Sequence, residues 1–228
     1  MSDPTPSAVL SDAFPVTGRS RLRRAHQRGS HEHADVYALL DTAPMCHVGY
    51  VIDGQAYVTP TLHWRVGNHV YWHGSSASRF LRQAQGTQVC LTVAMLDGYV
   101  MARSAFNHSV NFRSAMVFGR AFVVEDDAAK TEHLRDMVEG LFPGRWETLR
   151  PMTAQELKAT AVLGMAIDEA SAKVRSGPPG DGDEADVPVW AGELPVSLTF
   201  GTPRAAPEMP ADVALPPGLA DWIGTRRF

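Results

Sequence analysis

The 228-residue sequence has only two cysteines, no apolar run long enough to span a membrane and no excess of positive charge. Cys46 and Cys90 stand in apolar surroundings typical of buried thiols, and so few cysteines fit a reducing cytoplasm, where we expect the protein. A membrane helix needs about 20 apolar residues, so we expect no membrane contact. A net charge of −4 argues against a nucleic-acid partner, although the run Arg19–Arg28 is locally basic.

The composition, with 44% hydrophobic and 20% charged residues, is that of a soluble globular protein of one domain with tails. Residues 1–34 are polar and aperiodic, and we interpret them as an N-terminal arm. Residues 35–176 form the domain, and residues 177–228 begin with an acidic Gly/Pro-rich linker and continue as a C-terminal extension. Within this extension, residues 187–196 are expected to dock on the domain because Trp190 is strongly apolar.

The local patterns alternate between apolar and polar residues with tight turns between them, which predicts antiparallel strands. Short turns are expected at Asp53-Gly54, Gly67-Asn68 and Asp97-Gly98. Strands are predicted within residues 45–74, 87–105, 110–124 and 161–175, with helices at 35–43, 77–85, 126–142 and after the Thr153/Glu156 capping box. This predicts a mainly β fold, a closed or nearly closed barrel of six to seven antiparallel strands with peripheral helices. Gly119 is expected where a long strand bends to close the barrel.

Residues 71–86, with the sequence YWHGSSASRFLRQAQG, place three serines and an arginine where a strand passes into a short helix. Unpaired N–H groups and the helix dipole favour an anion there, hydroxyls add donors, and arginine meets phosphate oxygens two at a time. Ser75, Ser76, Ser78 and Arg79 are therefore candidate phosphate ligands. The alternative is that one serine caps the helix and the others are solvated.

Two further residues are unusual within a predicted β-strand, a proline and an arginine. Pro60, in the segment Thr59–Thr61, cannot donate to a strand ladder, so this strand should be open or irregular along one edge. Arg113 lies on an otherwise apolar strand and needs an anionic partner, either a ligand or a carboxylate such as Asp97 or Asp168.

The nine histidines do not form a recognisable catalytic or metal pattern. His31 and His33 lie in a segment that looks unstructured, so we expect no metal site there. His47, His63, His73 and His108 are scattered without the acid and nucleophile of a catalytic triad, and one of them could ligate a haem iron. No residue stands out as a catalytic acid or base.

Four segments together resemble a known family: GQAYVTPTLHW, VYWHGSSASRFLR, HSVNFRSAMVFGRA and IDEASAKVR. Their order and spacing are similar to those of the FMN-binding split-barrel flavoproteins related to pyridoxamine 5′-phosphate oxidase, particularly the branch of nitroimidazole-resistance proteins. The resemblance runs from about Asp35 to Trp190. It implies a split barrel of Greek-key or meander type and a homodimer with FMN at the subunit interface.

The resemblance also implies roles for individual residues. Tyr57, Val58, Thr59, Pro60 and Thr61 would run beside the isoalloxazine ring, and Trp72 and His73 would lie near the ribityl chain. Ser75, Ser76, Ser78 and Arg79 would hold the phosphate. Asn111, Arg113 and Ser114 would reach the cofactor from the partner subunit, and Lys173, with Arg175 a weaker candidate, would approach the ring from the last strand.

These features favour an FMN-dependent oxidoreductase that passes hydride or electrons from a reduced nicotinamide to a small nitro compound or quinone. The flavin performs this chemistry, and the protein orients it and shapes the substrate pocket. Pyridoxamine phosphate oxidation itself is not favoured, because the basic C-terminal residues expected for that substrate are not evident. Alternatives are deazaflavin F420 or haem on the same fold, and a flavin-binding sensor without turnover.

Overall fold

The computed structural model describes residues 12–43, 45–180, 182–184, 186–210 and 212–225. The strands in these residues are β1 (Gly29–Ser30), β2 (Met45–Ile52), β3 (Gln55–Val66), β4 (His69–Ser75), β5 (Gln88–Met101), β6 (Ser109–Val123), β7 (Thr160–Ala166), β8 (Glu169–Arg175) and β9 (Gly192–Pro195). The helices are α1 (His33–Thr42), α2 (Arg79–Ala84), α3 (Asp127–Leu141) and α4 (Ala154–Ala159), with short 3₁₀ turns between elements. None of the helices in these ranges is long and apolar enough to cross a membrane.

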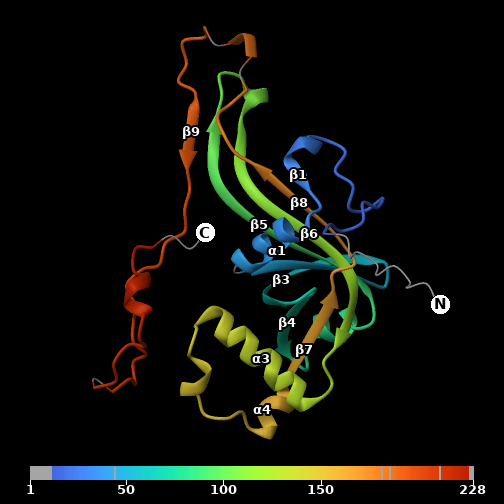
Figure 1. Cartoon of the computed structure of the whole chain (residues 1–228), viewed down its shortest axis with the longest axis vertical. Helices are drawn as coiled ribbons and strands as arrows, with labels where there is room; N and C mark the ends of the chain where they lie inside the picture. The colour runs from blue at the N-terminus through green and yellow to red at the C-terminus, as the bar shows by residue number, and fades with distance from the viewer. Residues whose placement is uncertain (1–11, 44, 181, 185, 211, 226–228) are drawn as a thin grey trace, which may run out of the picture.

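Six strands close a ring in the order β6, β7, β4, β3, β2, β5 and back to β6, and every pairing is antiparallel. β8 lies outside this ring beside β6, followed by the short β1, and β9 lies beside β5 (Figure 1). The prediction of a split barrel with six to seven antiparallel strands is confirmed, and β1 and β9 are short additions to it. Figure 1 also shows the β5–β6 hairpin extending well beyond the barrel.

β6 changes its partner strand at Gly119, the position where the sequence predicted a bend. Its edge pairs with β8 as far as Phe118 and with β7 from Ala121 onwards. A Cβ atom at Gly119 would lie 2.1 Å from the carbonyl oxygen of Ala166. Only glycine lets the two backbones approach this closely, and this approach closes the ring.

The turns at Asp53-Gly54 and Gly67-Asn68 are confirmed, but the turn predicted at Asp97-Gly98 is wrong. β5 continues through these residues to Met101, and a register shift between Leu96 and Gly98 leaves Asp97 as a β-bulge. Asp-Gly suits a bulge as well as a turn, because both need an irregular backbone. The bulge turns the Asp97 side chain towards β6, where it becomes part of the candidate site described below.

Two apolar clusters hold the fold together. The barrel interior contains the larger one, in which Trp72, Leu91 and Leu163 are fully buried. The smaller cluster lies on the outer surface of the barrel, where α3 covers Trp64, Tyr71 and Val162. The predicted helix over 126–142 is confirmed as α3, and the Thr153/Glu156 capping box begins α4 as expected.

The N-terminal arm is more structured between residues 12 and 30 than its sequence indicates. Phe14 is buried in the barrel core cluster, with its ring centroid 4.1 Å from that of His33. Arg19 forms an ion pair with Glu169, and β1 pairs with β8. One aromatic anchor and a two-residue strand produce no periodic pattern, so this docking could not be predicted from the sequence.

The C-terminal extension crosses the outside of the molecule. β9, which lies in the segment 187–196, pairs with Gly98–Met101 of β5. Beyond it the chain descends to α3 (Figure 1), where the rings of Trp222 and Phe142 stack with centroids 6.1 Å apart. Trp190 is 65% exposed and does not enter the core.

Candidate functional site

The serine-arginine corner, residues 75–79, joins the end of β4 to the start of α2. The Ser76 N–H donates to the Ala159 carbonyl at 2.8 Å and the Ser78 N–H to the Ser75 carbonyl at 2.9 Å, which fixes the backbone of the turn. Ser78 is the N-cap residue of α2, yet its side chain makes no capping hydrogen bond. The alternative in which a serine side chain caps this helix is therefore not the arrangement observed, and the Ser78 hydroxyl is available to a ligand.

Arg79 begins α2 with an exposed side chain. Its guanidinium carbon lies 5.5 Å from the centre of the Tyr57 ring, within the range of a cation–π contact. No carboxylate in the described residues forms an ion pair with it. An uncompensated guanidinium beside free hydroxyls suits an anionic group with several oxygens, such as a phosphate.

β3 brings its predicted residues beside this corner. The Tyr57 and Tyr50 rings stack with centroids 5.7 Å apart, and the Tyr50 hydroxyl lies 3.0 Å from the Thr59 hydroxyl. Tyr57, Thr59 and Thr61 are half-buried, whereas Val58 and Pro60 point outwards from the alternate positions.

The outer edge of this part of β3 is open. β3 pairs with β2 along residues 55–62, and β4 joins its other edge only from His63 onwards. The open edge at Pro60, expected because proline cannot donate, is thus observed within the described chain. Backbone N–H and C=O groups along it are free to meet the polar edge of a ring.

Two predicted residues do not join this group. Trp72 is fully buried inside the barrel, in the core cluster. His73 lies on the opposite face of β4, on the outer surface of the barrel, with its ring centroid 6.0 Å from that of Trp64. Burial lowers the pKa of His73, so its neutral form is favoured there.

A second group of predicted residues lies on β6 and β8. Arg113 donates two hydrogen bonds to Asp97, at 2.9 Å and 2.7 Å, so the carboxylate considered in the sequence as its partner is present. This contact raises the pKa of Arg113 and keeps the guanidinium charged. The Asn111 amide donates to Glu193 at 2.5 Å and accepts from the buried Arg175. Arg175 therefore positions Asn111 instead of facing solvent.

Ser114 and Lys173 belong to the other face of this strand pair. The Ser114 hydroxyl lies 3.4 Å from the Lys173 carbonyl, and the Lys173 ammonium lies 3.5 Å from the Arg24 carbonyl in the arm. Of the four residues predicted to reach the cofactor from β6 and β8, Asn111 and Arg113 thus face one side, and Ser114 and Lys173 face the other.

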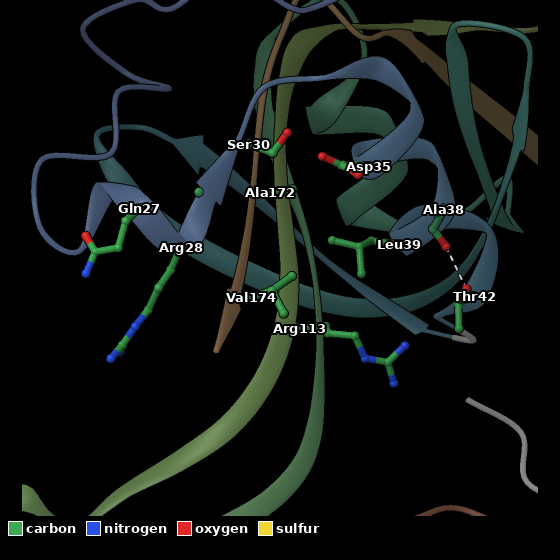
Figure 2. Close-up of a pocket in the computed structure, with 11 residues that line it drawn as sticks. Gln27, Arg28, Ser30, Asp35, Ala38, Leu39, Thr42, Arg113, Ala172 and Val174 are labelled. Atoms are coloured by element: carbon green, nitrogen blue, oxygen red, sulfur yellow. Dashed lines mark hydrogen bonds between the residues drawn. The ribbon is translucent and has the colours of Figure 1, made fainter. Parts of the chain in front are cut away.

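Two hollows meet at Arg113 and Val174. The first, of about 450 Å³, lies between the arm, α1 and β8 (Figure 2). The second, of about 410 Å³, continues towards Asn111, Arg175 and Glu193. Both volumes lie within the range of about 300–1,000 Å³ that small-molecule sites occupy. The first hollow could not be predicted from the sequence, because one of its walls is formed by the docked arm.

The ring of six antiparallel strands with β8 beside it defines a split-barrel protein. The family model described as pyridoxamine 5′-phosphate oxidase matches residues 32–174, and the chain belongs to this family. The resemblance inferred from the sequence is confirmed. No curated protein sequence matches the chain.

Solved structures extend the comparison. The flavocytochrome Anf3 from Azotobacter vinelandii is 45% identical, covers 90% of this chain and 97% of its own, and superposes with a TM-score of 0.86. An FAD and haem binding protein from Mycobacterium smegmatis is 37% identical, with coverage of 88% and 98% and a TM-score of 0.83. A protein from Bacteroides thetaiotaomicron assigned to 5-nitroimidazole antibiotic resistance is 19% identical, with coverage of 64% and 86% and a TM-score of 0.54, and shares the fold.

Proposed function

We propose that this chain is a flavin-dependent oxidoreductase that holds the flavin by its phosphate at the serine-arginine corner. The observation that carries the proposal is the pairing of an uncompensated Arg79 with uncapped serine hydroxyls beside the open edge of β3. The names of the two similar proteins, a flavocytochrome and an FAD and haem binding protein, support it. The riboflavin phosphate unit is common to the predicted FMN and to FAD, so the corner serves either cofactor.

The residues at the corner have separate tasks in this proposal. Arg79, Ser76 and Ser78 would hold the phosphate, and the open edge of Tyr57–Thr61 would orient the ring. When bound, the flavin supplies the hydride or electron transfer, from a reduced nicotinamide to a small nitro compound or quinone. The protein's own part is to place the ring along the open edge of β3.

A second copy of the chain completes the site in this proposal. The outward positions of β2 and β3 include Met45, Val51 and Val58, which are 47%, 57% and 67% exposed. An apolar sheet face of this kind is a common feature of subunit interfaces. A homodimer with twofold symmetry would bring Arg113 and Asn111 of one subunit to the corner of the other, at two equivalent sites.

The test is identification of the cofactor that copurifies with the full-length chain. We expect yellow protein with a flavin spectrum, one flavin per chain by mass spectrometry of the extract, and a dimer by sedimentation. Steady consumption of NADH or NADPH with nitro or quinone acceptors distinguishes an enzyme from a flavin-binding sensor. Colourless protein that takes up neither FMN nor FAD would contradict the proposal, and bound F420 would replace the cofactor.

Haem is a second candidate ligand, favoured by the extent of the comparisons. The flavocytochrome and the FAD and haem binding protein cover 90% and 88% of this chain, well beyond the 32–174 range of the family model. The nitroimidazole-resistance structure covers 64%. The similarity to the flavocytochrome and to the FAD and haem binding protein therefore extends outside residues 32–174.

His108 fits haem best among the four histidines considered from the sequence. His63 is buried with Nε2 2.9 Å from the Leu40 carbonyl, and the His73 ring lies beside the Trp64 ring on the outer surface of the barrel. His108 is exposed, and its Nδ1 lies 2.8 Å from the Ser104 carbonyl, which leaves Nε2 outward as in many metal-bound histidines. Phe106, 95% exposed two residues earlier, offers an apolar surface next to it.

We expect His108→Ala to remove the haem Soret band of haem-loaded protein while the flavin absorption remains. The reason is that the substitution deletes the iron ligand and leaves the serine-arginine corner intact. His47→Ala, which removes an exposed histidine on β2, is the matched control and should keep the band. A Soret band that survives in the His108 variant and disappears in the control would assign the ligand to His47 instead.

A further inference from the structure

The hollow between the arm, α1 and β8 is lined by residues from three separate parts of the sequence. Its floor is apolar, with buried Leu39 and Ala172 beside the half-exposed Val174. Ser30 and Asp35 lie at one end, and Arg28 and Arg113 extend at the other (Figure 2). We call this hollow the arm pocket.

The arm that forms one wall is held in place at several points. Gly29 and Ser30 pair with Lys173 and Ala172 of β8, and the Lys173 ammonium lies 3.5 Å from the Arg24 carbonyl. Further back, Phe14 is buried in the core and Arg19 pairs with Glu169. The basic run of the arm is therefore carried on a docked segment of the chain.

Four arginines of this arm have no carboxylate partner in the described residues. Arg21, Arg23, Arg24 and Arg28 all have exposed side chains, and none forms an ion pair there. They gather four positive charges within eight residues of a chain whose net charge is −4. Such a concentration of like charge favours an anion nearby, and Arg28 is the member of this group that lines the arm pocket.

The polar groups at the other end of the arm pocket suit a sugar. The Asp35 side chain is exposed in the first turn of α1. The Ser30 hydroxyl oxygen accepts from the Glu32 N–H at 3.1 Å, so its own proton is free to be donated. A carboxylate and a hydroxyl together can accept from and donate to ribose hydroxyls, as acidic residues do in dinucleotide sites.

We propose that the arm pocket binds the adenosine monophosphate portion of an adenine dinucleotide. The purine lies on the Leu39–Ala172–Val174 floor, the ribose hydroxyls meet Asp35 and Ser30, and the adenylate phosphate meets Arg28, which lines the pocket. This inference rests on the proposed flavin redox function, which has two dinucleotides to offer, FAD itself and a reduced nicotinamide donor. Both carry the same adenosine monophosphate group.

The first experiment titrates the full-length protein, freed of any copurified dinucleotide, with AMP in a calorimeter. We expect binding that weakens with added salt, because exposed charges are screened. Arg28→Ala should weaken AMP binding at least tenfold and Arg28→Lys less. Arg145→Ala, an exposed arginine next to the Trp146 turn, is the matched control and should leave the affinity unchanged. Absence of AMP binding, or equal affinity in the wild type and the Arg28→Ala variant, would overturn the proposal.

A second experiment separates the two sources of the group. If the pocket takes the adenylate of FAD, AMP binds FMN-loaded protein and not FAD-loaded protein. If it takes the nicotinamide donor, AMP competes with NADH or NADPH in both forms. Either result supports the site, and titration of AMP is informative even if no flavin binds. Tight binding of heparin or duplex DNA that AMP does not displace would show a polyanion surface instead and overturn the proposal.

Discussion

Replacing Arg79 with alanine is expected to weaken flavin binding by about 10–100-fold. Hydrogen bonds to a charged group contribute about 1.5–3 kcal/mol, and each 1.4 kcal/mol is a factor of ten in affinity. Arg79 is exposed, contacts the Tyr57 ring and has no ion-pair partner in the described residues, so its removal should cost little folding stability. The measurement is the dissociation constant of FMN and of FAD, followed by flavin fluorescence.

Two companion variants make this result specific. Arg79→Lys keeps the charge but loses the planar pair of donors, so its affinity should fall between those of the wild type and the alanine variant. Arg145→Ala removes an exposed arginine far along the chain and should leave flavin binding unchanged. If Arg79→Ala retains full affinity for both flavins, the phosphate is not at the serine-arginine corner.

Trp72→Ala is expected to lower the free energy of unfolding by about 3–5 kcal/mol, the usual cost of deleting a large buried aromatic side chain. The indole is fully buried in the barrel core, between strands that close the ring. Denaturant unfolding measures the change. Val213→Ala, at a position 55% exposed in the C-terminal extension, is the control and should shift stability by less than about 0.5 kcal/mol.

Trp72→Phe separates packing from ligand contact. The Trp72 indole N–H has no hydrogen-bond partner among the described residues, so phenylalanine removes a buried polar group while it keeps most of the aromatic volume. We expect flavin affinity to stay the same and stability to change less than in Trp72→Ala. A tenfold loss of flavin affinity with unchanged stability would instead place the indole against the cofactor, as the resemblance implied.

The fold was predictable because its signals are local. Asp53 and Gly54 both have positive φ angles, 50° and 77°, which is the backbone that an Asp-Gly hairpin needs. The capping box at Thr153 and the amphipathic α3 are likewise written in neighbouring residues. Asp97-Gly98 shows the limit of such signals, since the same dipeptide serves a turn or a bulge and only the pairing of β5 with β6 decides between them.

The candidate site was predictable where its residues are consecutive in the sequence. It was not predictable where a role depends on which face of a strand the side chain lies on. Residues 75–79 form one turn, so their sequence proximity implies spatial proximity. Trp72 and His73 are adjacent too, but strand geometry sends their side chains to opposite faces of β4, and the register with β3 puts Trp72 inside. The pairing of Arg113 with Asp97 could be raised as an alternative from the sequence, and only the bulge at Asp97 selects it.

The docked arm links the two ends of the family domain, and this has a consequence for how the protein matures. Arg19 reaches Glu169 across 150 positions of sequence, so the segment that leaves the ribosome early has its binding surface translated late. At about 5–20 residues per second, Arg19 waits on the order of ten seconds for Glu169 to be translated. The barrel strands preceding β8 can meet during that interval, which makes the wall of the arm pocket one of the last parts of the molecule to form.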